Sequence, residues 1–208
     1  MKGTLTALGL FAAGVLTGFS GIVPDSWDTG LAARIILYVL IFQVGLGLGA
    51  DGGLARVRKS LTPRILMLPV CTVVGTVLFS ALAGLAISAW STKDCISVGC
   101  GFGYYSLSSV IISGMKEASL GSDGAAALAA LALMTNMTRE ILSIAGAPLL
   151  VRLCGRTAPV VAAGVTSMDS ALPAISRSAG ADIVPVALVH GMVLEVATPV
   201  LVTFFCSL

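Results

Sequence analysis

Long runs of apolar residues follow one another along most of the chain, and short polar segments separate them. Seven runs lie at about 4–22, 29–50, 64–90, 95–115, 124–152, 158–178 and 183–207. A helix of about 20 residues crosses a hydrocarbon core of ~30 Å at 1.5 Å per residue. The pattern therefore predicts an all-α integral membrane protein with one transmembrane domain over residues 1–208.

The composition supports this prediction. Hydrophobic residues make up 57% of the chain and charged residues 11%, whereas about a quarter of a soluble domain is charged. The 24 glycines suit close packing of helices in a bilayer. The five cysteines form no CxxC pair or metal-ligand spacing, so we expect no metal site and no cofactor. Because no Walker, HExxH or GxSxG motif occurs, we do not expect an enzyme.

Two of the seven segments do not have the pattern of a uniform helix. Segment 95–115 holds three glycines at alternate positions followed by a Tyr- and Ser-rich patch, and segment 158–178 holds a Ser/Thr patch that ends at Pro173. Proline removes a backbone donor and disfavours helix in the residue before it. An offset of 63 places Gly101 on Gly164, which is a weak repeat signal. Paired, inverted and interrupted helices are a recurrent plan in transporters.

The distribution of Lys and Arg predicts the orientation. The loop after the second segment holds Arg56, Arg58, Lys59 and Arg64, which places it and the N-terminus in the cytoplasm. Three later arginines also reach the cytoplasm if both interrupted segments turn back to the side they entered. We therefore predict five full spans plus two re-entrant elements of opposite orientation, with an external C-terminus. Full crossing of both interrupted segments is the alternative.

Charged residues lie deep in segment 124–152. Arg139 and Glu140 are at least ten residues from either end, and each such charge costs roughly 2.5–3.5 kcal/mol on insertion. Glu140 shares a polar stripe with Asn136 and Ser143, so we predict that Glu140 and Asn136 bind a cationic substrate. Arg139 points about 100° away. We expect it to make a structural ion pair, or to bind carbonyls of an interrupted helix.

The interrupted segments supply further candidates for substrate binding. They are Tyr105, Ser106 and Ser108 in the first segment, and Ser167 and Asp169 in the second. Carboxylate, hydroxyl and freed carbonyl oxygens would together hold an ammonium group. The hydroxyls would alternatively bond back to their own helix, and Asp169 would alternatively cap a half-helix.

The last segment holds His190 and Glu195, which we predict to take part in proton coupling together with Glu140. The imidazole titrates close to physiological pH. A histidine that only satisfies packing is the alternative for His190. Glu195 shares a face with Gly191 and Thr198, which is consistent with a carboxylate that faces a pathway.

Several runs resemble the bacterial LysO-type lysine exporters. They are Gly45–Gly53, Gly101–Ser108, Asn136–Ile141, Ala163–Pro173 and Val184–Gly191. The resemblance covers nearly the whole chain. Members of this family depend on acidic residues within the membrane, and Glu140 matches one of them. Asp169 falls in the TSMD-like run of the family, whereas Glu195 matches no family pattern.

The resemblance implies proton-driven export of L-lysine, and of the analogue thialysine, across the bacterial inner membrane. Family members often carry further spans at the N-terminus. We therefore expect either a shortened form or, preferably, a separate small membrane subunit that supplies them. A homo-oligomer is left open, and no nucleic-acid partner is expected.

Two other functions remain as alternatives from the sequence. One is a sodium-coupled transporter of an organic anion, with Arg139 and half-helix ends on the substrate and Asp169 on sodium. The other is a non-transporting membrane scaffold subunit, in which the deep charges would serve packing alone.

Overall fold

A computed structural model describes residues 13, 14, 16, 17, 19, 20, 35, 39 and 63–208 of the protein. The predicted segments 4–22 and 29–50 lie almost wholly outside the described residues. The run Gly45–Gly53 and the basic loop at 56–59 lie entirely outside them. The fold described below is that of residues 63–208.

Three helices of the described part are long and apolar enough to cross a membrane. They are α4 (Pro63–Ala86), the α6 helix (Tyr105–Cys154) and α9 (Val184–Ser207). The described residues form helices and turns without strands, as the apolar pattern predicted. Many leucine, valine and phenylalanine side chains are exposed on the outer surface of α4. Such a surface suits contact with lipid, where every backbone group must be bonded inside its own helix.

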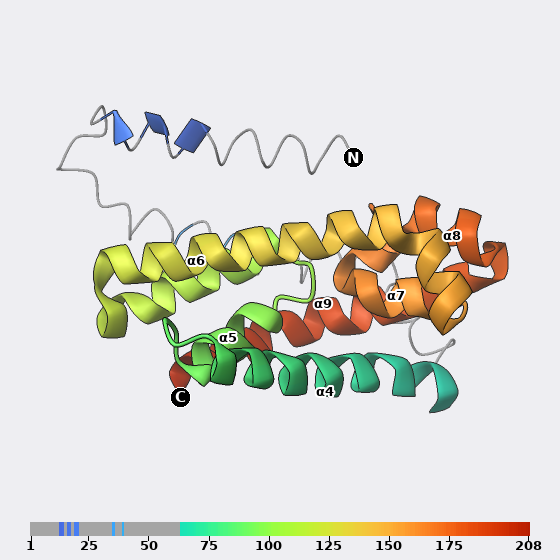
Figure 1. The fold of residues 1–208 in the computed structure, drawn as a ribbon, viewed down its shortest axis with the longest axis horizontal. Coiled ribbons are helices and arrows are strands. Elements are labelled where there is room, and N and C mark those ends of the chain that lie inside the picture. Colours follow the sequence, from blue (N-terminus) through green and yellow to red (C-terminus); the bar gives the residue numbers. More distant parts are fainter. Residues whose placement is uncertain (1–12, 15, 18, 21–34, 36–38, 40–62) are drawn as a thin grey trace.

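The α6 helix consists of two arms that reverse direction at Gly121, whose backbone is non-helical (φ 73°, ψ 171°). One unbroken helix would separate residues 103 and 136 by ~50 Å, yet Gly103 N–H donates to Asn136 Oδ1 over 2.8 Å. Figure 1 shows the second arm running back along the length of the molecule.

A first hairpin consists of α5 (Thr92–Gly99) and the first arm of α6, which begins at Tyr105. The helix is therefore interrupted inside the segment 95–115, at the glycines that predicted the break. Ser91 caps α5 reciprocally with Asp94. Asp94 also pairs with Lys116 at 2.8 Å, so both helices have their outer ends together.

A second hairpin approaches from the opposite end of the molecule. It consists of α7 (Ala158–Ala163), the 3₁₀ turn η1 (Gly164–Met168) and α8 (Leu172–Ala179). Arg156, just before α7, donates to the carbonyl of Ala179 over 2.7 Å, which brings the two outer ends together. A short turn η2 (Ala181–Ile183) then leads into α9. In Figure 1 α5, α7 and α9 lie between α4 and the second arm of α6, whereas α8 lies at the end of the molecule beside the last turns of that arm.

The two hairpin tips meet in the middle of the molecule. The N–H of Val165 donates to the carbonyl of Phe102 over 2.8 Å. Gly164 has a positive φ of 68°, and a Cβ there would lie 2.1 Å from the Phe102 oxygen. Only glycine permits this close approach. Phe102 is itself fully buried at φ 47°, a conformation that is costly for an aromatic residue.

Candidate functional site

A cavity of about 300 Å³ lies beside the crossing of the two tips. Its wall comes from both tips, from the second arm of α6 and from α9. Three carboxylates line it, namely Glu140, Asp169 and Glu195, and we call it the acidic cavity. No Lys, Arg or His is among the lining residues that the structure describes.

The three carboxylates come from three different elements. Glu140 lies near the middle of the second arm, ~21 Å of helix from its end at Cys154, and only 2% of it is exposed. Asp169 lies where the backbone leaves η1, and it accepts hydrogen bonds from Ser170. Glu195 lies on α9 and is partly buried. The three residues are far apart along the chain, so their spacing did not predict that all three line one cavity.

Hydroxyl groups complete the wall of the acidic cavity. Tyr105 and Ser106, both expected from the sequence, line it. Tyr104, Thr166 and Ser170 line it as well, although they were not among the predicted site residues. All three lie within the polar patches at the two breaks, so the signal was present in the sequence.

Three other predicted substrate ligands lie outside the lining of the acidic cavity. The Asn136 amide donates to the carbonyls of Val98 and Ala132 and accepts from Gly103 N–H, which fixes the first tip. The Ser108 hydroxyl donates back to the carbonyl of Tyr104. These two side chains therefore hold the backbone that carries the cavity wall.

The third, Ser167, belongs to a buried network around His190. The Ser167 hydroxyl donates to the carbonyl of Ala187 and lies 3.4 Å from His190 Nδ1. The Nε2 atom of His190 lies 2.9 Å from the Thr72 hydroxyl. His190 is fully buried and does not line the acidic cavity. The network joins η1 to α9 and α4.

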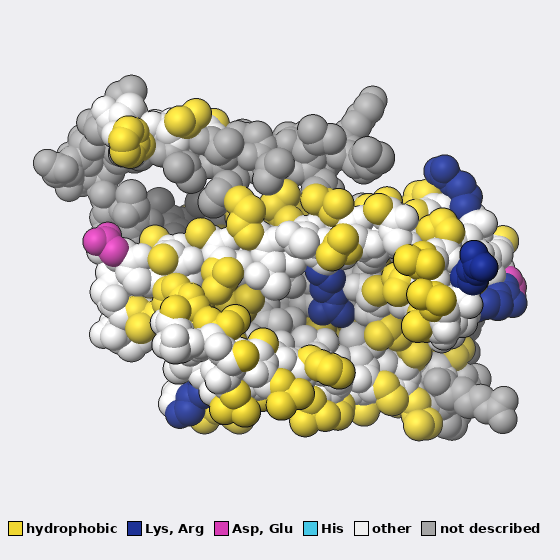
Figure 2. Space-filling view, in the orientation of Figure 1, with side chains coloured by type: hydrophobic (Ala, Val, Ile, Leu, Met, Phe, Trp, Pro, Cys, Tyr) yellow, Lys and Arg dark blue, Asp and Glu magenta, His cyan; other side chains and the backbone are white. Residues whose placement is uncertain are grey.

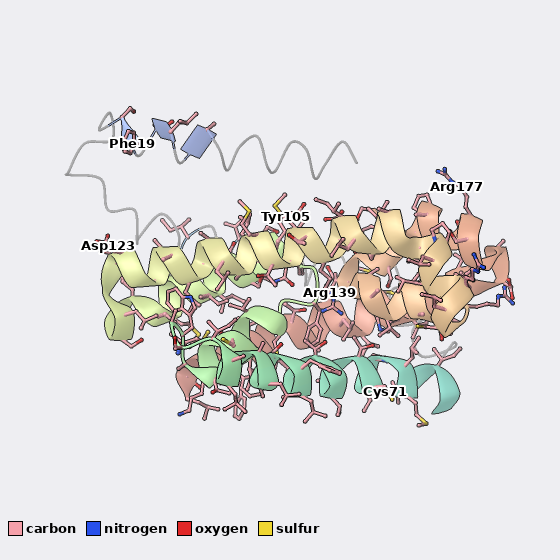
Figure 3. The ribbon with its side chains drawn as sticks, in the orientation of Figure 1. Phe19, Cys71, Tyr105, Asp123, Arg139 and Arg177 are labelled. Carbon is pink, nitrogen blue, oxygen red and sulfur yellow. The ribbon has the colours of Figure 1, made fainter. Side chains whose placement is uncertain are left out.

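Arg139 points away from the acidic cavity. Its Nε donates to the carbonyl of Ala162 over 2.8 Å, and its Nη2 donates to that of Val161 over 3.1 Å. Its guanidinium carbon lies 5.8 Å from the centre of the Phe102 ring. Figure 3 shows Arg139 between α6 and α4. In the structure it thus binds carbonyls of the second hairpin.

Within the described ranges, no group of three His, Cys, Asp or Glu side chains is arranged to hold a metal ion. An ammonium needs both charge compensation and several oxygen acceptors when it leaves water. The cavity offers both.

Comparison with known proteins identifies the family of this chain. The model of the family described as lysine exporter LysO matches residues 8–206. The chain belongs to the lysine exporter LysO family. The matched residues include both hairpins and the residues that line the acidic cavity. These features therefore lie in the region that the chain shares with the family.

Two relatives of this exporter family member illustrate the similarity. The lysine exporter LysO of Escherichia coli (strain K12) is 31% identical over 204 residues, and the chain spans 64% of its length. A protein of Haemophilus influenzae whose name also refers to lysine export is 30% identical over 172 residues, which are 83% of each chain. No solved structure matches the chain.

Proposed function

We propose that this protein is a secondary active exporter of L-lysine that exchanges lysine for protons across the bacterial inner membrane. The observation that carries the proposal is the acidic cavity, where Glu140, Asp169 and Glu195 meet and the described residues of the wall include no basic one. The names of its relatives point to the same substrate.

The charge of the cavity suits a cationic amino acid. The ammonium groups of lysine would bind carboxylates, with the hydroxyls of Tyr105, Ser106 and Ser170 as further acceptors. Thialysine has the same two ammonium groups, so we expect it to be carried as well. Because protons neutralise the same carboxylates, a proton and a lysine compete for the cavity. This competition is the basis of the proposed exchange.

The arrangement of the hairpins supports alternating access. We propose that α5 with the first arm of α6, and α7 with α8, re-enter the membrane from opposite sides and meet at its midplane. Interrupted helices that meet around a central site are a known transporter architecture. Such backbone is tolerated at depth only where it is buried in protein or lines water.

The ends of the molecule support the proposed orientation. Arg152, Arg156 and Arg177 lie at the end with α7 and α8, where Figure 2 shows dark-blue side chains gathered. At the opposite end, Lys93 donates to the carbonyl of Leu208. By the positive-inside rule, the arginine-rich end is cytoplasmic and the C-terminus external. The sequence also predicted two further full spans in the N-terminal segments, a companion membrane subunit and an open choice of homo-oligomer. These remain predictions.

Flux of radiolabelled lysine in proteoliposomes tests the function. We expect uptake or release that depends on a pH gradient and is unchanged between two sodium concentrations. Glu140→Gln should abolish the flux while the protein remains folded, because the substrate ammonium then loses its buried carboxylate. Asp123→Asn is the matched control, since it makes the same chemical change at an exposed position near the reversal (Figure 3).

Two results would argue against the proposal. Full lysine flux from the Glu140→Gln protein would remove the acidic cavity from the mechanism. Flux that follows sodium and an organic anion, with no response to lysine, would instead favour the sodium-coupled alternative.

A further inference from the structure

A second cavity, of about 510 Å³, lies on another side of the crossing tips. Residues of α4, α5, α7 and the second arm of α6 line it, and no Asp or Glu is among the lining residues that the structure describes. Arg139 carries the charge of this described wall, and we call the cavity the Arg139 cavity. Figure 2 shows dark-blue atoms inside a hollow at the centre of this face, where Figure 3 labels Arg139.

The positive charge of Arg139 is only partly compensated. Its described hydrogen bonds use Nε and Nη2 and go to neutral carbonyls. In the part of the chain that the structure describes, Nη1 has no hydrogen-bond partner, and no carboxylate pairs with the guanidinium. A guanidinium at this depth is costly unless it is paired, so the cavity favours an anion.

The hydroxyls of the wall add to this preference. Thr76, Ser80 and Thr135 line the Arg139 cavity, and no hydrogen bond to another described residue occupies their hydroxyls. Helical Ser and Thr usually bond back to a carbonyl one turn earlier, as Thr72 does. These three hydroxyls therefore remain able to donate to a ligand beside the guanidinium.

The adjacent residues Glu140 and Arg139 line two different cavities of opposite charge. Glu140 faces a cavity whose described wall has three carboxylates and no basic residue, which can hold ammonium groups and repels a carboxylate. Arg139 faces a cavity whose described lining includes no acidic residue. An amino acid carries both kinds of group, so the acidic cavity by itself does not distinguish lysine from a diamine.

We propose that the Arg139 cavity is a binding site for a small monovalent anion, held by the guanidinium and the neighbouring hydroxyls. Two sources share this chemistry. One is the α-carboxylate of the amino acid substrate, which would make Arg139 a determinant of specificity. The other is a free inorganic anion such as chloride. Only the first source rests on the proposed lysine transport.

Competition for lysine flux distinguishes the two sources. In the wild type, lysine should inhibit at least about tenfold better than 1,5-diaminopentane, which lacks the carboxylate, since hydrogen bonds to charged groups have this magnitude. Arg139→Gln should reduce this ratio, and Arg139→Lys should retain part of it. Arg177→Gln, at an exposed position on α8, is the matched control.

Flux that depends on chloride in the wild type, and that no longer depends on chloride in Arg139→Gln, supports the inorganic source.

Labelling of Cys71 tests the site without reference to transport. Cys71 is exposed and lines the Arg139 cavity, and Cys154 is replaced by Ser so that it does not react. An anionic thiosulfonate should label Cys71 faster than a cationic one of similar size. Lysine or chloride should slow this reaction, and 1,5-diaminopentane should not. Thr76→Val, which leaves Arg139 in place, should weaken the protection.

The outcomes separate the two proposals. Absence of lysine flux in the wild type, with faster labelling by the anionic reagent and protection by chloride, would contradict lysine export and support the anion site. Equal labelling by both reagents, or no labelling, would overturn the anion site and leave the export proposal standing. An unchanged lysine-to-diamine ratio in Arg139→Gln, together with flux and labelling that do not respond to chloride, would overturn it as well.

Discussion

At the scale of single residues, the buried side-chain amide of Asn136 hydrogen-bonds to backbone groups of three residues and holds them together. It is 1% exposed, and its amide connects Val98, Ala132 and Gly103 through three hydrogen bonds. A Cβ on Gly101 would collide with it at 2.5 Å. The polar stripe on the helix predicts that Asn136 faces inward, whereas its partners depend on where the first tip lies.

We predict that Asn136→Asp destabilises the protein, because a carboxylate accepts from Gly103 N–H but cannot donate to the two carbonyls. Removing hydrogen bonds from buried groups costs about 1–3 kcal/mol each. Thermal unfolding of the purified protein measures the loss, with Met134→Leu at an exposed position as control. An unchanged unfolding temperature together with a raised KM for lysine would instead make Asn136 a substrate ligand.

At the scale of elements, each hairpin is closed at its outer end by one basic and one acidic residue. Lys116 and Asp94 are 8% and 4% exposed, whereas Arg156 and Asp182 form an exposed pair. A buried ion pair has lost its hydration, so the removal of one partner leaves an uncompensated charge.

We predict that Lys116→Met costs about 3–5 kcal/mol of stability because it leaves the Asp94 carboxylate buried without its partner. The double change Lys116→Met with Asp94→Asn should recover part of this loss, since the asparagine is neutral and its side-chain oxygen can still accept from the N–H of the N-cap residue Ser91. Thermal unfolding of both variants measures the difference. Arg156→Gln is the control and should change the unfolding temperature little. A double variant no more stable than Lys116→Met would contradict this account.

At the scale of the whole molecule, the two hairpins enter from opposite ends and meet in the middle (Figure 1). The arginines of the end with α7 and α8, and the C-terminus at the other end, therefore belong to opposite sides of the proposed membrane. Both cavities lie between these ends, beside the crossing of the tips.

We predict that a thiol reagent that cannot cross membranes labels Cys154 only in inside-out vesicles. Ser207→Cys, placed at the other end, should react only in right-side-out vesicles. Cys71 is replaced by Ser in both proteins, and Cys154 is also replaced by Ser in the Ser207→Cys protein. The remaining cysteines of the described part are buried. Labelling of both positions from the same side would contradict the proposed orientation.

The sequence alone predicted much of the architecture, because insertion into a membrane requires each apolar segment to form a helix within its own stretch of chain. Runs of aliphatic residues predicted α4, the second arm of α6 and α9 within a few residues. Gly99 to Gly103 and Pro173 predicted interruptions because glycine and proline act on their own stretch of backbone. The deep positions of Glu140 and Asp169 predicted part of the acidic cavity for the same local reason.

Only the tertiary structure decided which of these groups meet. The reversal at Gly121 and the contact between Val165 and Phe102 join residues far apart in the chain. They bring Glu195 to Glu140, remove Asn136 and His190 from the acidic cavity, and direct Arg139 into a cavity of its own. Helical periodicity fixes the face on which a side chain lies, and packing of distant elements fixes what that face contacts.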